Sequence, residues 1–327
     1  MRNILFLVTL IIFLSPSGIS QGYVYIPADT PSSGGCNMIP FNWPSTATVK
    51  SCRYQMILSG RFLPTAPIRI YDISFAPCKT SPLPRSWSSR KFLVRMCHTT
   101  MNDFSGNNCF DKNLCRCATV LHDGPIQWQI NPENWSPFNL AGSFGYDGRR
   151  NILLDIEALT NSGGISCHGD RTTAIPRLWS NQVPPEACGS EDTAGLKIRL
   201  TYARTCILQV PETASLGTST PVHMLQAPTG KFYQMAASLG QWPPIDLVAC
   251  KVCLAIDPVL VYSILVGPPI FTYYAGVINP TGTADGKFVP PVIKELAGLC
   301  VFHAAVAYDT KAGVLCCTNT CGTLLVP

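Results

Sequence analysis

The stretch Leu196-Lys197-Ile198-Arg199-Leu200-Thr201-Tyr202 alternates apolar and polar side chains at every step. Successive side chains of a β-strand point to opposite faces of the sheet, so this order predicts a strand with one buried and one solvated face. The chain shows no long run of apolar residues at the three- and four-residue spacing of a helix. The stretch therefore favours an all-β protein.

Similar short strands are predicted on both sides of this stretch, between turns supplied by 28 prolines and 25 glycines. In the first half they cover Cys52–Leu58, Ile68–Phe75, Phe92–Cys97, Gln127–Ile130 and Asn151–Glu157. In the second half they cover Val222–Gln226, Phe232–Leu239, Val259–Leu265, Ile270–Val277, Gly286–Val289, Cys300–Tyr308 and Val314–Cys317. Many short strands at this spacing are typical of antiparallel sandwiches and barrels. We expect two antiparallel β-sandwich domains of the jelly-roll or immunoglobulin-like kind.

Length and composition support this organisation. A chain of 327 residues suggests two domains at about 150 residues each. Only 13% of the residues are charged, against ~25% in typical soluble domains, which excludes a coiled coil, a long helical bundle and a disordered charged tail. The best linker candidate is Pro211–Ser219, and it divides the mature chain into residues 21–211 and 212–327. The net charge of +5 is too small and too dispersed to predict nucleic-acid binding.

Residues 1–20 have the layout of a secretory signal peptide. Arg2 supplies the positive region, an apolar run follows from Ile4 to Leu14, and small residues stand at Gly18 and Ser20. The apolar run is shorter than the ~20 residues that a membrane span needs. We expect cleavage before Gln21 and an extracellular or cell-surface product with no membrane span after cleavage.

Cysteine usage agrees with secretion, because all 16 cysteines lie after the predicted signal peptide. An even number of cysteines in an oxidising compartment predicts disulfides. Ten precede Pro211 and six follow it, so we expect each bridge to stay on one side of that residue. The alternative is a zinc site built from Cys250, Cys253, Cys317 and Cys321. The disulfide candidates are Cys36, Cys52, Cys78, Cys97, Cys109, Cys115, Cys117, Cys167, Cys188, Cys206, Cys250, Cys253, Cys300, Cys316, Cys317 and Cys321.

Several turns and strands resemble a module of secreted proteins from environmental bacteria, which often carry PEP-CTERM-like sorting signals. The motifs that carry the resemblance in the first half are Trp135–Leu140, Phe144–Gly148, Asn151–Ile156 and Arg177–Trp179. In the second half, Ser238–Gly240, Ala275–Gly282 and Leu296–Gly298 are similar to the small immunoglobulin-like sandwich that follows this module. The resemblance implies a fold and an extracellular location, and it implies no reaction.

Catalytic motifs are weak in this sequence. Cys167 and His168 are neighbours, but adjacent side chains of an extended chain point apart, which is poor geometry for a nucleophile and its base. The Gly164–Gly169 segment lacks the Gly-x-Ser-x-Gly spacing of a nucleophile elbow, and the five histidines contain no His-x-x-x-His pair. We expect a protein without catalysis.

Binding is the simpler expectation. Exposed tryptophans on a sandwich can stack on sugar rings, which makes Trp128, Asn131 and Trp135 candidate ligand-binding residues. Asp147 and Asp155 flank one turn and are candidate calcium ligands, since carboxylates on sandwich loops hold this ion. We expect a secreted structural or adhesion protein whose partner is extracellular matrix, a glycan or another surface protein. The alternative is a carbohydrate-binding or carbohydrate-active protein.

Overall fold

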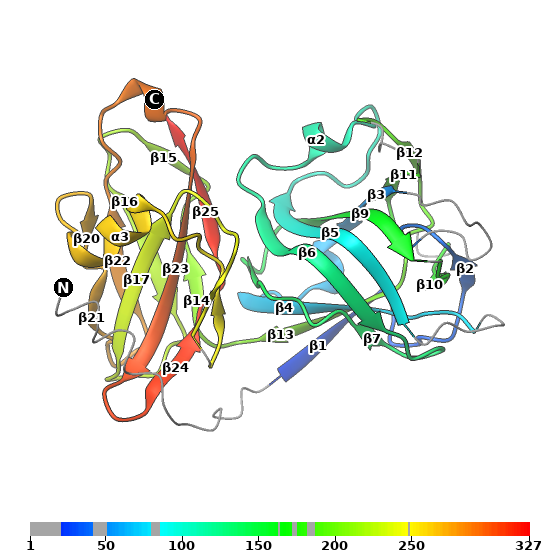
Figure 1. The fold of residues 1–327 in the computed structure, drawn as a ribbon, viewed down its shortest axis with the longest axis horizontal. Coiled ribbons are helices and arrows are strands. Elements are labelled where there is room, and N and C mark those ends of the chain that lie inside the picture. Colours follow the sequence, from blue (N-terminus) through cyan, green and yellow to red (C-terminus); the bar gives the residue numbers. More distant parts are fainter. Residues whose placement is uncertain are drawn as a thin grey trace.

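The computed structural model describes residues 21–41, 51–79, 86–162, 164–171, 175–181, 187–247 and 249–327, without the side chains of residues 160–162. The predicted signal peptide lies outside these residues. Strands dominate, so the all-β expectation is confirmed. Strands from residues 21–203 form one group of sheets, the N-terminal unit, and strands from residues 207–326 form another, the C-terminal unit (Figure 1).

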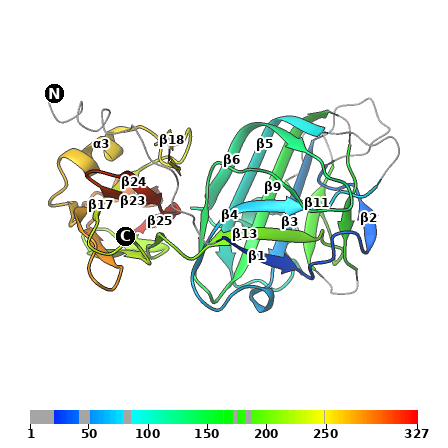
Figure 2. The same cartoon turned by 90° about the horizontal axis from the view of Figure 1, so that it is seen from below.

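The larger sheet of the N-terminal unit has six strands among the described residues. Its spatial order is β12 (Ser190–Asp192), β11 (Arg177–Ser180), β3 (Cys52–Leu58), β9 (Asn151–Ser162), β5 (Ser86–Thr99) and β6 (Thr119–Gln129). The facing sheet is β1 (Gln21–Ile26), β13 (Ile198–Ala203), β4 (Ile68–Phe75) and β7 (Ser136–Pro137), with β8 (Phe144–Tyr146) on β4. An antiparallel pair of segments that are distant in sequence, β2 (Gly35–Asn37) with β10 (Cys167–Gly169), lies at one end, where Figure 2 labels β2.

The N-terminal core fills the space between these two sheets. Tyr54 and Ile156 from the larger sheet pack in one apolar cluster with Ile73 and Leu200 from the smaller one. In β13 the predicted alternation holds over Ile198, Arg199 and Leu200. Lys197 and Thr201 are buried, although the sequence predicted them on the solvated face, and Tyr202, beyond a β-bulge, is partly exposed.

The C-terminal unit is also built from two sheets around one apolar cluster, with a β-pair beside them. One sheet is β14 (Ile207–Gln209), β16 (Thr220–Leu225), β22 (Ala284–Phe288) and β20 (Phe271–Thr272). The other is β15 (Thr213–Ser215), β25 (Cys321–Val326), β23 (Cys300–Asp309), β17 (Phe232–Ser238) and β21 (Ala275–Val277), with β24 (Gly313–Cys317) on β23. The pair is β18 (Ile245–Asp246) and β19 (Lys251–Val252).

The chain changes from one group of sheets to the other between Ala203 and Ile207, where β13 ends and β14 begins. The predicted linker begins later, at Pro211, and its first part forms β15, which pairs in parallel with β25. The linker prediction relied on small and polar residues, and these also suit a short edge strand.

One predicted strand is a helix. The apolar run over Val259–Leu265 belongs to α3 (Pro258–Leu265). The other helical turns in the described part of the chain are α2 (Phe110–Asn113), η1 (Gly60–Phe62) and η2 (Lys294–Leu296). Asp257 caps α3 by accepting the Leu260 N–H at 2.8 Å, and Pro258 suits the first helical position. None of the described helices is both long and apolar enough to cross a lipid bilayer.

All sixteen cysteines lie within the described part of the chain, and ten of them form five disulfides. The pairs are Cys36–Cys78, Cys109–Cys188, Cys117–Cys300, Cys206–Cys316 and Cys250–Cys317. Cys52, Cys97, Cys115, Cys167, Cys253 and Cys321 remain thiols. The expectation that every bridge stays on its own side of Pro211 is wrong, because Cys117–Cys300 and Cys206–Cys316 cross it.

The two units are joined by covalent and hydrogen bonds. The Cys117–Cys300 disulfide connects the start of β6 to the start of β23. Beside it, Gln241 donates to the Ala118 carbonyl at 2.9 Å and accepts the Val120 N–H at 2.9 Å. The buried Arg69 guanidinium donates to the backbone carbonyl of Cys317. These contacts fix one unit against the other.

Candidate functional site

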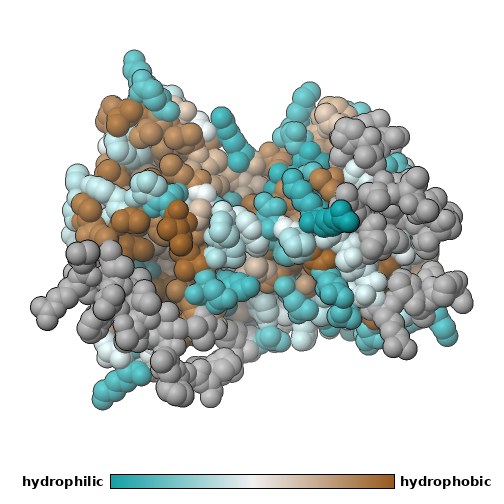
Figure 3. Space-filling model, viewed as in Figure 1, coloured by the Kyte–Doolittle hydropathy of each residue, from teal (hydrophilic) through white to brown (hydrophobic). Residues whose placement is uncertain are grey.

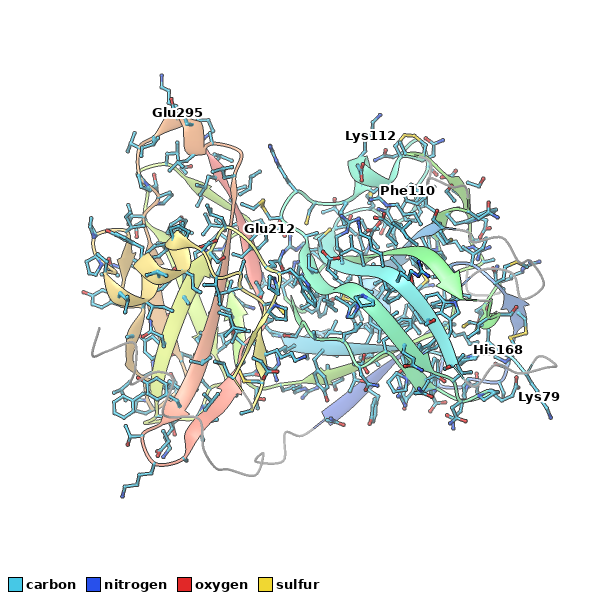
Figure 4. All side chains as sticks on the ribbon, in the orientation of Figure 1. Lys79, Phe110, Lys112, His168, Glu212 and Glu295 are labelled. Carbon is cyan, nitrogen blue, oxygen red and sulfur yellow. A yellow bond between two sulfur atoms is a disulfide. The ribbon has the colours of Figure 1, made fainter. Side chains whose placement is uncertain are left out.

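A cavity of about 690 Å³ lies at the junction of the two units. Its lining comes from the end of β5, from β8 and the turn that follows, and from the segments 208–213 and 320–324. Figure 3 shows the notch between the units on one face, and Figure 4 shows Glu212 at this junction. The volume falls within the ~300–1,000 Å³ of small-molecule sites.

Four charged or titratable side chains meet in this cavity. Arg150 donates to Asp147 Oδ2 at 2.7 Å and to Glu212 Oε1 at 2.5 Å. His98 Nδ1 lies 3.6 Å from Glu212 Oε1, and His98 Nε2 accepts the Asp147 backbone N–H at 3.2 Å. We call these residues, His98, Asp147, Arg150 and Glu212, the junction network.

Local sequence explains how Asp147 reaches this position. Its Oδ1 accepts the N–H groups of Arg149 and Arg150 at 2.9 and 3.2 Å, as short acidic side chains do in turns. Gly148 follows with φ +78°, and a Cβ there would lie 2.5 Å from the Thr65 carbonyl oxygen. The turn therefore needs glycine, and it aims the aspartate into the cavity.

The junction network keeps both carboxylates ionised. The nearby His98 ring is the largest influence on Glu212, and with Arg150 it holds the pKa of Glu212 below its usual value. Burial raises the pKa of Asp147, but the hydrogen bonds from the Arg150 side chain and from the backbone N–H groups of Arg149 and Arg150 outweigh it, so that this pKa is also lowered. A general acid needs a pKa near the working pH, which these carboxylates lack.

Thiols also line the cavity. Cys115 donates its backbone N–H to Cys97 Sγ at 3.3 Å, and a hydrogen bond from the Cys115 thiol lowers the pKa of Cys97. The same bond, with burial, raises the pKa of Cys115. Burial raises the pKa of Cys321, on the opposite wall, to about 12. The cavity thus holds one thiol pair in direct contact.

Cationic side chains are in excess at the cavity rim. Arg116 and Arg149 line it and are exposed, and neither forms a salt bridge with any residue that the structure describes. The junction network itself pairs Arg150 with Asp147 and Glu212, which leaves these two arginines without acidic partners. An anionic group at the rim would find complementary charge there.

A second feature is the exposed face of α3. Leu260 and Ser263 are buried, and the Ser263 hydroxyl accepts the Ala237 N–H of β17 at 3.0 Å. Val261 and Leu265 are 49% and 53% exposed, and their spacing of four residues places them on one side of the helix. Among the described residues, every exposed large apolar side chain except Tyr23 lies between Phe232 and Leu299.

The sequence-predicted ligand residues do not form an exposed aromatic platform. Trp128 is 1% exposed, and its indole N–H donates to the Ser136 carbonyl at 3.1 Å within the core. Trp135 is 8% exposed and packs against Tyr25. Asn131 is exposed, and its backbone N–H donates to Ser136 Oγ. Because sugar stacking needs an open ring face, the structure corrects the expectation at both tryptophans.

The two calcium candidates lie apart in different environments. Asp155 is fully buried; its Oδ1 accepts from Gln55 at 2.8 Å and its Oδ2 from Arg95 at 2.5 Å. Arg53 contacts the same carboxylate at 3.3 Å, so both oxygens are already engaged. Asp147 belongs to the junction network. The structure therefore does not bring Asp147 and Asp155 together as one calcium site.

The predicted zinc alternative is also corrected, because Cys250 and Cys317 are bonded to each other. Another group of three ligand-type side chains within 4.8 Å of one another is present in the described residues, namely Cys36, Cys78 and His168. The two sulfurs of this group form a disulfide. Sequence reasoning had considered His168 only with its neighbour Cys167.

Sequence reasoning missed His98, Arg150 and Glu212 as site residues. They lie in three separate segments, and the sequence contains no motif that links them. The Asp147-Gly148 turn was the available signal, and it marks one corner of the cavity.

Comparisons with known proteins give no family. No family model and no curated protein matches the chain. Among solved structures, the chain is similar to a protein described as membrane anchored from Corynebacterium diphtheriae, with 10% identity, a TM-score of 0.23, and coverage of 85% of this chain and 58% of that one. It is also similar to a beta-1,2-glucanase from Parabacteroides distasonis, with 12% identity, a TM-score of 0.22, and coverage of 94% and 37%. A beta-glucuronidase from Faecalibacterium prausnitzii has 8% identity and a TM-score of 0.23, with coverage of 96% and 47%.

This chain therefore spans between 37% and 58% of the length of those proteins. TM-scores this low carry no functional argument.

Proposed function

We propose that this chain is an extracellular structural or adhesion protein that acts by binding, without catalysis. The observation that carries the proposal is the concentration of exposed apolar side chains on the C-terminal unit, with Val261 and Leu265 on the free face of α3. Large exposed apolar patches on soluble proteins often mark interaction sites. The five disulfides support an extracellular location, as does the sequence resemblance to secreted bacterial modules.

The chemistry of the cavity supports binding over turnover. Asp147 and Glu212 share Arg150, and both have lowered pKa values, so neither holds a proton for donation at neutral pH. A glycosidase of the usual kind needs one protonated and one ionised carboxyl group. The coupling of the two units through Cys117–Cys300 also suits a protein that presents a fixed surface.

The test compares binding with turnover in the same protein. Purified residues 21–327 are mixed with washed envelope material of the producing cells, sedimented, and assayed for the bound fraction. They are also incubated with a panel of polysaccharides and esters. We expect sedimentation with the envelope and no hydrolysis product. The doubly substituted Val261→Asp/Leu265→Asp protein should lose most of the bound fraction, because removing a carboxylate from water into an apolar contact costs free energy.

Tyr23→Asp is the matched control, since Tyr23 is 46% exposed and lies on β1 of the N-terminal unit, outside the apolar surface of the C-terminal unit. It should sediment as the unchanged protein does. Equal binding by the α3 double variant would contradict the proposed surface. Turnover of any panel member that disappears in Glu212→Gln would contradict the absence of catalysis.

A second candidate function, carbohydrate binding, is favoured by the rim of the cavity. Arg116 and Arg149 carry charge without acidic partners among the described residues, which suits an acidic glycan over a neutral one. A glycan array with Arg116→Gln/Arg149→Gln as the comparison tests this candidate. Saturable binding to uronic-acid or sulfated glycans that weakens in the double variant supports it, and an array without signal excludes it.

A further inference from the structure

Cys36, Cys78 and His168 are held together by backbone pairing at the end of the N-terminal unit. In the pairing of β2 with β10, Cys36 is directly opposite His168. The Cys78 N–H donates to the Ser166 carbonyl at 2.8 Å, and the His168 N–H donates to the Ala76 carbonyl at 2.8 Å. Figure 4 shows His168 and Lys79 at this end, far from Glu212. The arrangement therefore belongs to the scaffold and is independent of the junction cavity.

The His168 ring is oriented by a carboxylate. Its Nε2 lies 3.1 Å from Glu133 Oε1, and the same oxygen accepts the Lys79 backbone N–H at 2.7 Å. The hydrogen bond with His168 is the largest influence that lowers the pKa of Glu133. An ionised carboxylate is a pure acceptor, so Nε2 carries the proton that faces it.

The other nitrogen of this ring has no partner. Nδ1 is buried without a hydrogen bond within the described residues, and the His168 side chain is 6% exposed. In the neutral ring with Nε2 protonated, Nδ1 presents a lone pair. A ring nitrogen of His168 and the two sulfurs lie within 4.8 Å of one another. Buried polar atoms without partners are uncommon and call for a physical explanation.

We propose that reduction of the Cys36–Cys78 disulfide converts this group into a zinc site. The ligands are the two thiolate sulfurs and His168 Nδ1, and water fills the fourth position. Glu133 supports the site by accepting the Nε2 proton, the arrangement that metal-bound histidines usually have. Two sulfurs and one imidazole suit Zn²⁺, which prefers such ligands in tetrahedral geometry.

The chemistry balances with a dithiol as the reductant. The dithiol transfers two electrons and two protons to the Cys36–Cys78 bond, becomes a disulfide itself, and leaves two cysteine thiols. Zn²⁺ then replaces the two thiol protons, which pass to solvent. The sulfurs are thus either bonded to each other or bound to the metal. The other four disulfides lack such a histidine within the described residues.

Cobalt(II) is the probe, because its thiolate complexes absorb in the near ultraviolet and its tetrahedral complexes absorb in the visible. Purified residues 21–327 are reduced with a dithiol under nitrogen, desalted and titrated with Co²⁺. Circular dichroism and alkylation mass spectrometry record the fold and the bonds reduced. We expect one Co²⁺ per chain with both bands, displacement by Zn²⁺, and no bands in the oxidised protein.

Variants assign the ligands. His168→Gln should abolish the tetrahedral bands or weaken Co²⁺ binding at least tenfold, and Glu133→Gln should weaken it about 10–100-fold. His223→Gln is the matched control, because His223 is exposed and bonded to Asp285 elsewhere. It should bind Co²⁺ as the unchanged protein does. The same is expected of Cys109→Ser/Cys188→Ser, which removes another disulfide.

A second route avoids reduction, in case loss of the other disulfides unfolds the chain. The Cys36→His variant cannot form this disulfide, and its new histidine takes the place of the Cys36 sulfur as a ligand. It should therefore bind Co²⁺ without reductant and show the near-ultraviolet absorption of a single thiolate. Binding in neither the reduced protein nor Cys36→His overturns the proposal. Binding that His168→Gln leaves unchanged also overturns it.

Discussion

The Cys117–Cys300 disulfide should contribute more to stability than its position near the surface suggests. It closes a loop of 183 residues in sequence, and the Cys109–Cys188 and Cys206–Cys316 disulfides shorten the remaining covalent path between its ends to about 40 residues. The chain-entropy relation then gives about 4 kcal/mol for the bridge, as an upper value, because the denatured chain is not a random coil. Replacing both cysteines by serine should lower the free energy of unfolding by up to that amount.

The assay is guanidinium unfolding followed by far-ultraviolet circular dichroism and tryptophan fluorescence. We expect the unchanged protein to unfold in one transition, because the disulfide and the Gln241 hydrogen bonds couple the units. The Cys117→Ser/Cys300→Ser protein should unfold in two, with the first midpoint at lower denaturant. Each unit has its own apolar cluster, so each should still unfold cooperatively.

Cys109→Ser/Cys188→Ser is the matched control. That disulfide spans 79 residues within the N-terminal unit. It belongs to the same covalent ring of three bridges, so the same relation gives it about 4 kcal/mol as well. Its removal should destabilise the N-terminal unit without freeing the C-terminal unit from it. The reasoning is refuted if Cys117→Ser/Cys300→Ser keeps a single transition and loses less than about 1 kcal/mol, well below the entropic value.

Three further predictions concern individual side chains or pairs of side chains. Asp155→Ala should destabilise the chain by about 3–5 kcal/mol in denaturant unfolding, because it leaves two arginines facing a buried site without their carboxylate; an effect below about 1 kcal/mol would contradict this pairing. Asp147 and Glu212 have folded pKa values below their unfolded values, so their stabilisation is complete above about pH 4.5 and is lost as the pH falls through the folded values. Acid titrations of the melting temperature should therefore flatten in Asp147→Asn/Glu212→Gln, and an unchanged acid limb would count against the junction network. Cys97 and Cys115 should form a sixth disulfide in secreted material, because their thiols are already in contact; peptide mapping that finds both alkylated without reduction would show otherwise.

Local pattern was enough to predict much of the sheet structure. Cys52–Leu58 and Ile68–Phe75 are strands with the predicted bounds, because apolar and β-branched residues between turns favour a strand that is buried on both sides or on one. Val259–Leu265 is also rich in apolar and β-branched residues, yet it forms α3. The Asp257-Pro258 pair distinguishes this segment from the strands, because it begins and caps a helix. A prediction based only on the number of apolar residues does not take this pair into account.

Burial of the tryptophans depended on contacts that the sequence could not show. Trp128 faces the other sheet and contacts Phe138, which follows soon after it in the sequence, and Phe41, which comes from a distant segment. The residues next to a tryptophan in the sequence do not show whether its ring is buried or exposed. That depends on whether a second sheet packs against it. Cysteine parity failed for a similar reason, because Cys117 lies in one unit and its partner Cys300 in the other.

The junction network shows why a site between two units is harder to predict than a core. His98 and Asp147 lie on one unit, whereas Glu212 lies beyond the change of sheet, and Arg150 joins the two carboxylates across the gap. Each residue alone has the features of an ordinary polar surface position. The pKa of Glu212 is lowered by His98 and Arg150, which both belong to the N-terminal unit. Docking of the two units creates the chemistry of the cavity, so a perturbation that separates the units should also remove the lowered pKa of Glu212.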